Sequence, residues 1–430
     1  MWRADLHLHS PHSKGGSPRV TLSGMKGAAM KKGIDLLGTG DCFHPKWKEA
    51  IGDMEVEDES GFLYSWDKEA RFVPTVEVSC EAAQKRVHVL MAFADMDAAG
   101  VVEKKVAPFS DNIEVEGRPV IKLPVSKLME CVKDCNEDKV LVIPAHCLTP
   151  WFGIMGDRNH LLDIRDELTV MPDAFETGLS ADKKMVKQLA GMEDVPLVSF
   201  SDAHSLHNIG REVTEFDCGF SWEEMVKAIR GNETSTIEFP PALGMYHVSG
   251  HRNCNYRQYE CDNAWGDIMC PVCKRKLTIG VEQRVKMLKD KDVEMEEQYL
   301  IPLIQLINHS LGIEQITRDA MSLYDIIISG NKEIDVLCNI PIVDVRVDSS
   351  IKLLIESMRN RHIKIIPGYD GVYGIIVNTY KLMNDAMMAA DRLKREGKSY
   401  QSEWDRVIAM EKIMVKRDMV MRPGDEQVFH

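Results

Sequence analysis

Short apolar runs alternate with helix-like stretches along roughly the first 240 residues of the chain. Several of the apolar runs are rich in β-prone residues and lead into a polar residue; they cover 34–38, 72–76, 87–93, 140–144 and 196–200. The stretch 126–135 instead has apolar Leu128, Met129 and Val132 at helical spacing. This alternation predicts an α/β fold with a parallel sheet, either open or closed into a barrel.

The pattern changes after the break at Phe239-Pro240-Pro241. A Cys- and His-rich insert follows at about 245–280, and the last third of the chain has a more helical pattern. In that third, residues 299–311 predict an amphipathic helix, 363–376 predict two strands around a glycine-rich turn, and two further amphipathic helices are expected to close the chain. A chain of 430 residues is too long for one ordinary core, and its length suggests two or three domains. With the changes in pattern, we expect them at 1–240, 241–292 and 293–430.

Composition and charge narrow the functional classes. The chain is 44% hydrophobic and 28% charged, as is usual for globular proteins, and its apolar runs are shorter than the roughly 20 residues that cross a bilayer. Polar Asp5, His7 and His9 stand where a signal peptide would be apolar, so we expect a cytoplasmic protein without a membrane partner. The net charge of −14 argues against a generic nucleic-acid coat but leaves room for a nuclease with a carboxylate-rich site.

His7 and His9 begin a series of residues of the types that bind metals. Strand alternation would place Asp5, His7 and His9 on one face, so that two imidazoles converge. Further candidate ligands, all but His88 at or just past the end of an apolar run, are Asp41, Glu77, His88, His146, Asp202 and His204. Because ligands collect at strand ends in parallel α/β folds, we expect one site built from distant segments.

The chemistry of this ligand set favours hydrolysis of a phosphoester. Mixed imidazole and carboxylate ligation suits Zn²⁺, Mn²⁺ or Fe²⁺. The candidate ligands outnumber those that a single ion uses, which predicts two or three ions. Paired ions can bridge an attacking hydroxide and the attacked and leaving oxygens of a phosphate.

Four cysteines gather in the insert: Cys254, Cys261, Cys270 and Cys273. The turn Cys270-Pro271-Val272-Cys273 presents two thiolates, which is half of a tetrahedral zinc site. Cys254 and Cys261 would complete an all-cysteine shell, while His251 or His247 can replace either of them. A closed shell leaves no open position, so this zinc is expected to be structural.

Three further features could contact nucleic acid. A basic run beginning at Lys274 and Arg275 fits either a solvated helix face or a contact with a phosphate backbone. Trp151 and Phe152 either stack on an unpaired base or pack against the rim of a barrel. The exposed-looking turn around Tyr369 is most simply an ordinary hairpin.

The segment Asp5-Leu6-His7-Leu8-His9-Ser10, with the later His, Glu and Asp-x-His positions, resembles the polymerase-and-histidinol-phosphatase (PHP) superfamily. Within it, the chain is similar to the endonuclease Q family over nearly its whole length. The matching segments are 38–41, 75–78, 86–88, 144–151, 200–205, 210–212, 270–273 and 367–371. The last two lie outside the catalytic domain and separate this family from histidinol phosphatases.

The resemblance implies an α/β fold: a distorted (βα)7 PHP barrel over 1–240, a Cys-rich zinc-binding module over 241–292 and a mainly helical, DNA-gripping domain over 293–430. It implies cleavage of DNA on the 5′ side of deaminated bases (uracil, hypoxanthine, xanthine) or abasic sites by metal-activated hydroxide. The lesion would be selected by flipping the nucleotide into a pocket. The alternatives are a PHP-type phosphatase or exonuclease acting on a small phosphoester or a DNA end, and a repair scaffold whose barrel is inactive.

The resemblance also implies roles for particular residues. The barrel ligands would be His7, His9, Glu77, His88, His146, Asp202 and His204, with Asp41 added, and His7, His9, Asp202 and His204 would be catalytic. They would hold two or three divalent metals (Zn, Mn, Mg or Fe), and one structural Zn would lie in the Cys module. DNA contacts are expected from Trp151, Phe152, Arg211, Lys274, Arg275 and Tyr369. The partner would be damaged DNA, double- or single-stranded, with a replication clamp as a further candidate.

One departure from the superfamily pattern bears on the number of metals. Many members have an acid a few residues after the HxH motif, whereas residues 11–15 here contain none. Either His12 or Asp41 compensates, or the site holds two metals rather than three.

Overall fold

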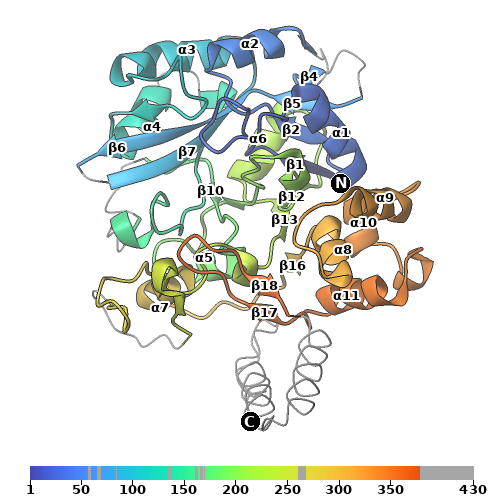
Figure 1. Ribbon diagram of the computed structural model, residues 1–430. Helices are drawn as coiled ribbons and strands as arrows, with labels where there is room; N and C mark the ends of the chain where they lie inside the picture. The colour runs from blue at the N-terminus through green and yellow to red at the C-terminus, as the bar shows by residue number, and fades with distance from the viewer. Residues whose placement is uncertain are drawn as a thin grey trace, which may run out of the picture.

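The computed structural model describes residues 1–56, 60–64, 69–83, 85–133, 135, 137–159, 163, 164, 168, 170–259 and 268–377. It has the mixed α/β architecture that the apolar pattern predicts (Figure 1). Its largest sheet has the order β16-β13-β12-β1-β2-β5-β4-β3. These strands are β1 (Trp2–Asp5), β2 (Leu36–Gly38), β3 (Glu55–Val56), β4 (Leu63–Tyr64), β5 (Arg71–Val73), β12 (Val213–Phe216), β13 (Thr234–Glu238) and β16 (Gln298–Tyr299).

The second sheet, β8-β6-β7-β9, corrects the expectation of parallel strands. It consists of β6 (Thr75–Ala82), β7 (Lys85–Phe93), β8 (Val120–Ile121) and β9 (Val140–Pro144). Strand β7 is antiparallel to both β6 and β9, whereas β1, β2 and β5 in the first sheet are parallel. Strand β6 ends at Ala82 and β7 begins at Lys85, which leaves room for a hairpin but not for a crossover helix.

Three two-stranded sheets complete the described strands. They are the parallel pair β10 (Phe175–Glu176) and β11 (Leu197–Val198), and the antiparallel pairs β14 (Gly250–His251) with β15 (Tyr256–Arg257) and β17 (Ile365–Ile366) with β18 (Ile375–Ile376). The last pair confirms the predicted strand, turn and strand. Hydrogen bonding therefore divides the described strands into separate sheets rather than one closed barrel.

Helices cover the sheets of the N-terminal part. They are α1 (Leu22–Lys32), α2 (Pro45–Gly52), α3 (Met96–Val106), α4 (Val125–Lys133), α5 (Lys183–Lys187) and α6 (Trp222–Arg230), and α4 confirms the helix predicted near 126–135. Helices α2, α3 and α4 lie over the β6–β7 side of the molecule (Figure 1). Strand β9 is buried along its whole length, as expected for a strand covered on both faces.

The C-terminal part is mainly helical and packs against the N-terminal strand region. Its helices are α7 (Val281–Leu288), α8 (Leu303–Leu311), α9 (Arg318–Ile327), α10 (Glu333–Cys338) and α11 (Ser349–Arg359). The helix predicted over 299–311 begins only at 303, because Pro302 caps it and Tyr299 belongs to β16. Arg3 joins the two parts through Glu215 and Asp335, at 2.9 and 3.1 Å. The two closing helices predicted from the sequence lie outside the described residues.

Short 3₁₀ helices connect several of these elements. They are η1 (Ala107–Phe109), η2 (Glu137–Lys139), η3 (Asp157–Asn159), η5 (Leu206–Asn208), η6 (Pro241–Leu243), η7 (Arg252–Cys254) and η8 (Ile342–Asp344). Among the described residues, none of the helices has the length and apolar character needed to cross a membrane.

Candidate metal centre

His7 and His9 lie in an extended segment just after β1. The strand ends at Asp5, earlier than the HxH pattern predicts, but a parallel bridge between Leu8 and Ala203 continues the extended course. His9 N donates to Ala203 O at 3.0 Å, and Ala203 N donates to His7 O at 3.2 Å. This register places the HxH segment directly against the segment that carries Asp202 and His204.

Asp5 does not join its two neighbours at the site. Its carboxylate accepts hydrogen bonds from Ser201 N at 3.0 Å and Gly210 N at 2.8 Å. Burial raises the pKa of Asp5 to about 6, although these hydrogen bonds lower it. The Asp5 carboxylate therefore fixes the two loops that bring Asp202 into place.

Seven of the predicted ligands form three overlapping groups whose ligand atoms lie within 4.8 Å of one another. The groups are His7, His9 and Glu77; His9, Asp202 and His204; and Glu77, His88 and His146. His9 belongs to two groups and so does Glu77, so the groups form one continuous cluster. The ligands come from β6, β7 and the loops after β1, β9 and β11, which are far apart in the sequence.

The His7 ring shows that this cluster fits a cation. Its Nδ1 lies 2.8 Å from Glu176 Oε1, so the opposite ring nitrogen faces the cluster. That Nε2 atom is fully buried, has no hydrogen-bond partner, and lies 3.6 Å from both Glu77 Oε1 and Asp202 Oδ1. An unsatisfied buried nitrogen between two carboxylate oxygens is the geometry of a metal ligand.

Glu77 and His88 occupy strand interiors rather than strand ends. Glu77 lies within β6 opposite Leu90, and His88 lies within β7 opposite Ser79. The two side chains still meet, with His88 Nδ1 2.8 Å from Glu77 Oε1. His146 follows β9, and its Nε2 is 3.2 Å from the same oxygen. The placement of Glu77 at a strand end is therefore corrected: the β6–β7 hairpin, not a parallel strand edge, presents this half of the cluster.

Asp41 lies beside the cluster but outside its three groups. Its Oδ2 accepts from Ser10 N at 2.8 Å, and its Oδ1 accepts from Ser13 Oγ at 2.9 Å and lies 3.3 Å from His9 Nδ1. These contacts occupy the carboxylate, which departs from the expectation that Asp41 is itself a ligand. Asp41 instead orients His9 so that Nε2 of that ring faces Asp202 at 3.1 Å.

The electrostatics of the cluster favour bound positive charge. Burial raises the pKa of Glu77, but His88, Arg118 and His7 offset this and hold the pKa well below its ordinary value. Burial lowers the pKa of His7, yet Glu176, Glu77 and Asp202 raise it well above its ordinary value. Burial lowers the pKa of His88 to about 4 against the attraction of Glu77. The carboxylates thus stay ionised in a buried place, where a bound cation would balance them.

Two residues near the cluster escaped the sequence prediction. Glu176, at the end of β10, accepts from His146 N at 2.8 Å as well as contacting His7. Glu176 follows Phe175 at the end of a short apolar segment, and this is the same position relative to a strand that marked the other acids as candidates. Arg118 Nη1 donates to Glu77 Oε2 at 3.0 Å, and no metal-ligand pattern in the sequence marks an arginine.

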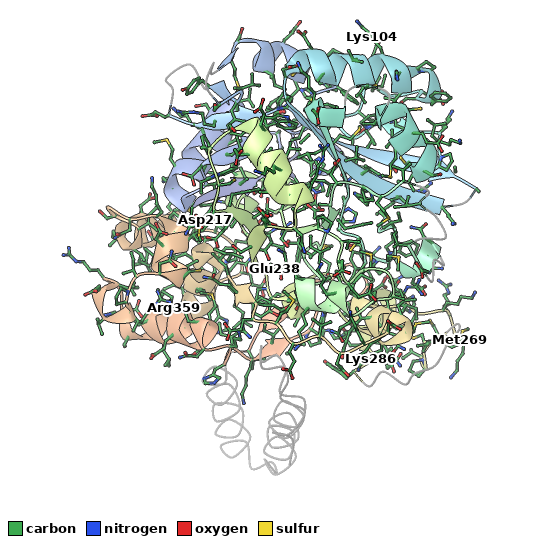
Figure 2. All side chains as sticks on the ribbon, turned by 180° about the vertical axis from the view of Figure 1, so that it is seen from behind. Lys104, Asp217, Glu238, Met269, Lys286 and Arg359 are labelled. Atoms are coloured by element: carbon green, nitrogen blue, oxygen red, sulfur yellow. The ribbon has the colours of Figure 1, made fainter. Side chains whose placement is uncertain are left out.

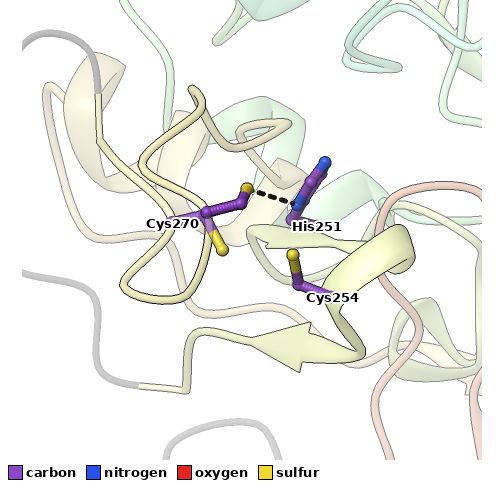
Figure 3. Close-up of side chains that lie close together, drawn as sticks. His251, Cys254 and Cys270 are labelled. Carbon is purple, nitrogen blue, oxygen red and sulfur yellow. Dashed lines mark hydrogen bonds between the residues drawn. The ribbon is translucent and has the colours of Figure 1, made fainter.

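A second cluster lies in the Cys-rich insert and contains His251, Cys254, Cys270 and Cys273 (Figure 3). Cys273 Sγ lies 3.3 Å from His251 Nδ1. Burial raises the pKa of Cys270, but backbone N–H groups of Cys273 and Val272 and the His251 ring lower it to about 6. Of the two histidines considered for this shell, His251 lies in the cluster, whereas His247 Nδ1 is 3.4 Å from Ser180 O. Cys261 falls outside the described residues.

The predicted DNA-contact residues divide into exposed and buried ones. Lys274, Arg275 and Trp151 are exposed, and the Arg158 guanidinium lies 4.5 Å from the Trp151 ring centre. Phe152 stacks on His88 with ring centres 4.2 Å apart, so it packs against a candidate ligand. Tyr369 is only 2% exposed, which corrects the expectation of an exposed tyrosine.

The hairpin turn at 367–374 nevertheless has one exposed tyrosine, Tyr373, with 42% of its surface exposed. Buried Arg211 donates from Nη1 to Tyr373 Oη at 3.1 Å. Its Nε donates to Ser201 O at 2.8 Å and its Nη2 to Asp202 O at 3.3 Å. Arg211 therefore connects the hairpin with the segment of Asp202, and it is not itself available to a ligand.

Comparisons with known proteins find one matching family model and two similar solved structures. A family model described as PHP-associated matches residues 183–234. The crystal structure of a lesion-specific endonuclease from Pyrococcus furiosus is 29% identical, with a TM-score of 0.75, and covers 87% of this chain and 94% of that one. An endonuclease Q in complex with a 27-mer duplex with an abasic lesion at the active site is 28% identical, with a TM-score of 0.77, and covers 87% and 96%.

Two relatives come from an archaeon and a bacterium. An uncharacterized protein of Methanocaldococcus jannaschii is 31% identical over 248 residues, which are 54% of this chain and 31% of that protein. An uncharacterized protein of Bacillus subtilis is 28% identical over 313 residues, which are 67% of this chain and 77% of that protein. The chain therefore matches about a third of the archaeal relative and most of the bacterial one.

Proposed function

We propose that this protein is a metal-dependent DNA repair endonuclease that cleaves beside damaged nucleotides. The chain belongs to the endonuclease Q family of the PHP superfamily. The observation that carries this proposal is the continuous cluster of seven ligands around the unpartnered His7 Nε2. The likeness to a lesion-specific endonuclease extends over 87% of the chain, and thus well beyond the metal-bearing part.

The cluster would hold two or three divalent metals (Zn, Mn, Mg or Fe) through its overlapping groups. When bound, such ions supply Lewis acidity and a nucleophile derived from water at neutral pH. The chain itself fixes the ligand orientations: Glu176 holds His7 and the backbone of His146, Asp41 holds His9, and Phe152 packs on His88. Loss of such a supporting contact typically lowers metal affinity or activity by about 10–100-fold.

The finer architecture is also part of the proposal. The sheets of residues 1–240 would correspond to a distorted (βα)7 PHP barrel, 241–292 to a zinc module and 293–430 to a DNA-gripping domain. His251, Cys254, Cys270 and Cys273 would hold the structural zinc, because three thiolates and one imidazole form a closed tetrahedral shell. Exposed Lys274 and Arg275 beside this cluster would contact the phosphate backbone.

The substrate would be DNA with a deaminated base (uracil, hypoxanthine or xanthine) or an abasic site, cut on the 5′ side of the lesion. Exposed Trp151, near His146, is available for stacking on an unpaired base. Deamination replaces an amino donor with a carbonyl acceptor, so a pocket that donates hydrogen bonds can select the lesion after it is flipped out. The relatives give no support for a replication clamp as a partner, and we propose none.

End-labelled duplexes test the function. The full chain is incubated with Mn²⁺ or Mg²⁺ and duplexes that carry uracil, hypoxanthine, an abasic site or no lesion. We expect a single cut 5′ of each lesion and none in the undamaged duplex. Equal cleavage of all four duplexes, degradation from the ends, or hydrolysis only of a small phosphomonoester would contradict the proposal and favour the exonuclease or phosphatase alternative.

A further inference from the structure

Arg118 reaches the metal centre from a segment that is held from two sides. The segment precedes β8; Ser79 N donates to Pro119 O at 2.9 Å, and Gly117 N donates to His12 O at 3.0 Å. A Cβ atom added to Gly117 would lie 2.3 Å from Asp41 Oδ2, so this position requires glycine. The backbone at 117–119 therefore packs between the loop that contains His12 on one side and strand β6 on the other.

The Arg118 guanidinium faces the carboxylates of the cluster. Nη1 donates to Glu77 Oε2 at 3.0 Å, and Asp202 and Asp41 are close enough to help Glu77 raise the pKa of Arg118 against the opposing effect of burial. The side chain keeps 20% of its surface exposed, whereas Glu77 has none. Among the described residues Arg118 makes no other side-chain hydrogen bond, so most of its N–H groups remain available.

We propose that Arg118 is a catalytic residue that binds the scissile phosphate and stabilises the charge that develops on its non-bridging oxygens. This inference rests on the proposed endonuclease function. A guanidinium presents paired N–H donors in a fork that matches two phosphate oxygens, and it stays protonated throughout a reaction. Placed at the edge of the metal cluster, it would add a fixed donor at the point where the phosphate meets the ligands.

The competing explanation is that Arg118 only holds Glu77 in position. The two explanations differ in the sign of their effect on metal binding. A guanidinium 3.0 Å from a ligand oxygen repels a divalent cation, so removing it should leave metal affinity equal or higher if its role is toward the phosphate. If Arg118 were needed to orient Glu77, the same substitution should weaken metal binding.

The test uses the full chain and the variants Arg118→Gln and Arg118→Lys. Mn²⁺ titration of the metal-stripped proteins measures affinity, and single-turnover cleavage of an abasic duplex under saturating Mn²⁺ measures the rate constant and half-saturating concentration. We expect Arg118→Gln to slow cleavage by about 10²–10³-fold with Mn²⁺ affinity unchanged or tighter. Arg118→Lys keeps the charge but loses the paired N–H donors, so its cleavage rate should lie between those of Arg118→Gln and the unmodified protein.

A rescue experiment tests the same role. Guanidinium chloride at millimolar concentration should partly restore cleavage by an Arg118→Ala variant.

Lys122→Gln is the matched control, because Lys122 follows β8 on the same segment and its side chain is 59% exposed, paired with Asp111. It removes one positive charge from the same region and should leave the rate constant unchanged. Cleavage by Mn²⁺-loaded Arg118→Gln within threefold of the unmodified protein, or weaker Mn²⁺ binding by that variant, would overturn the inference. If the unmodified protein cuts no lesion-bearing duplex, the proposed function itself fails, which is a different and recognisable result.

Discussion

The chain places two metal-binding clusters in contrasting surroundings. In the His/carboxylate cluster, His7, His9 and Glu77 are at most 1% exposed and lie between sheets packed on a large apolar core. In the His/Cys cluster, Cys273 is exposed and Cys254 is half-buried. Figure 2 shows Met269, the residue before Cys270, at the edge of the molecule.

The supporting contacts differ as much as the burial. At the His/carboxylate cluster, carboxylates outside the three ligand groups orient two of the imidazoles: Glu176 contacts His7 and Asp41 contacts His9. The His/Cys cluster is carried by the two-residue strands β14 and β15 and by a tight turn in which Lys274 N donates to Cys270 O at 2.9 Å. The fold alone thus positions the residues of the first cluster, whereas a bound metal would itself hold the local structure of the second cluster together.

Asp202→Asn should have the largest effect on activity. The substitution keeps the shape of the side chain but removes the charge that pairs with His9 and His7, so cleavage of an abasic duplex should fall by about 10³-fold or more. Because the framework is preformed, the thermal unfolding midpoint should change little. Asp217→Asn, on a side chain that is 88% exposed, provides the control and should cleave normally. A fully active Asp202→Asn protein would remove the cluster from the mechanism.

Cys270→Ser tests the opposite property at the second cluster. The Cys270 side chain is buried within the turn. Loss of its thiolate should abolish zinc binding and unfold the local backbone, because a structural zinc supplies much of the folding free energy of a small module. We expect loss of one zinc by elemental analysis and rapid proteolysis near 254–273, with the main unfolding transition retained. Cys131→Ser, outside both clusters, should do neither. Zinc retained by Cys270→Ser would show that the turn does not hold a metal.

The sequence predicts most residues of the two clusters, but it does not predict the neighbouring residues and strands that hold them in position. Local patterns can be recognised in a single sequence, and three of them mark these clusters: the HxH segment, the Asp-x-His segment and the Cys270–Cys273 turn. The antiparallel β6–β7 hairpin was missed because a run of buried β-prone residues has the same appearance in parallel and antiparallel sheets. Glu77 was therefore expected at a strand end although it lies inside β6.

The remaining differences concern residues whose role depends on distant partners. Asp41 has the residue type of a ligand, but Ser10 and Ser13 occupy its carboxylate, and only the fold brings those groups together. The glycines around Tyr369 predict an exposed turn, yet Gly250 and Asn255 of the Cys-rich insert cover this side chain. Arg118 is 41 residues from Glu77 in the chain, a separation that no spacing rule detects.

Glu176→Gln should have an intermediate effect that is specific to the first cluster. The substitution weakens the acceptor for His7 Nδ1 and for His146 N, so metal affinity should fall by about 10–100-fold while the zinc of the second cluster is retained. Mn²⁺ titration with separate zinc analysis measures both quantities. Glu130→Gln, at an exposed helical position, serves as the control. If Glu176→Gln released the metals of both clusters together, the separation between a preformed and a metal-dependent site would be wrong.

Tyr373→Phe should have the smallest effect, and it tests the connection between the two clusters. The hairpin at 367–374 contacts the Cys-rich insert through Asp370, which accepts from Arg252 N at 2.8 Å. It contacts the Asp202 segment through Tyr373 and Arg211. Removing the Tyr373 hydroxyl costs one hydrogen bond of about 0.5–1.5 kcal/mol, so the cleavage rate should fall only a few-fold. In a Cys270→Ser background we expect the Cys-rich insert no longer to position the hairpin. The same substitution should then have no further effect, because contacts within one network are not additive. Equal few-fold losses in both backgrounds would mean that the clusters act independently.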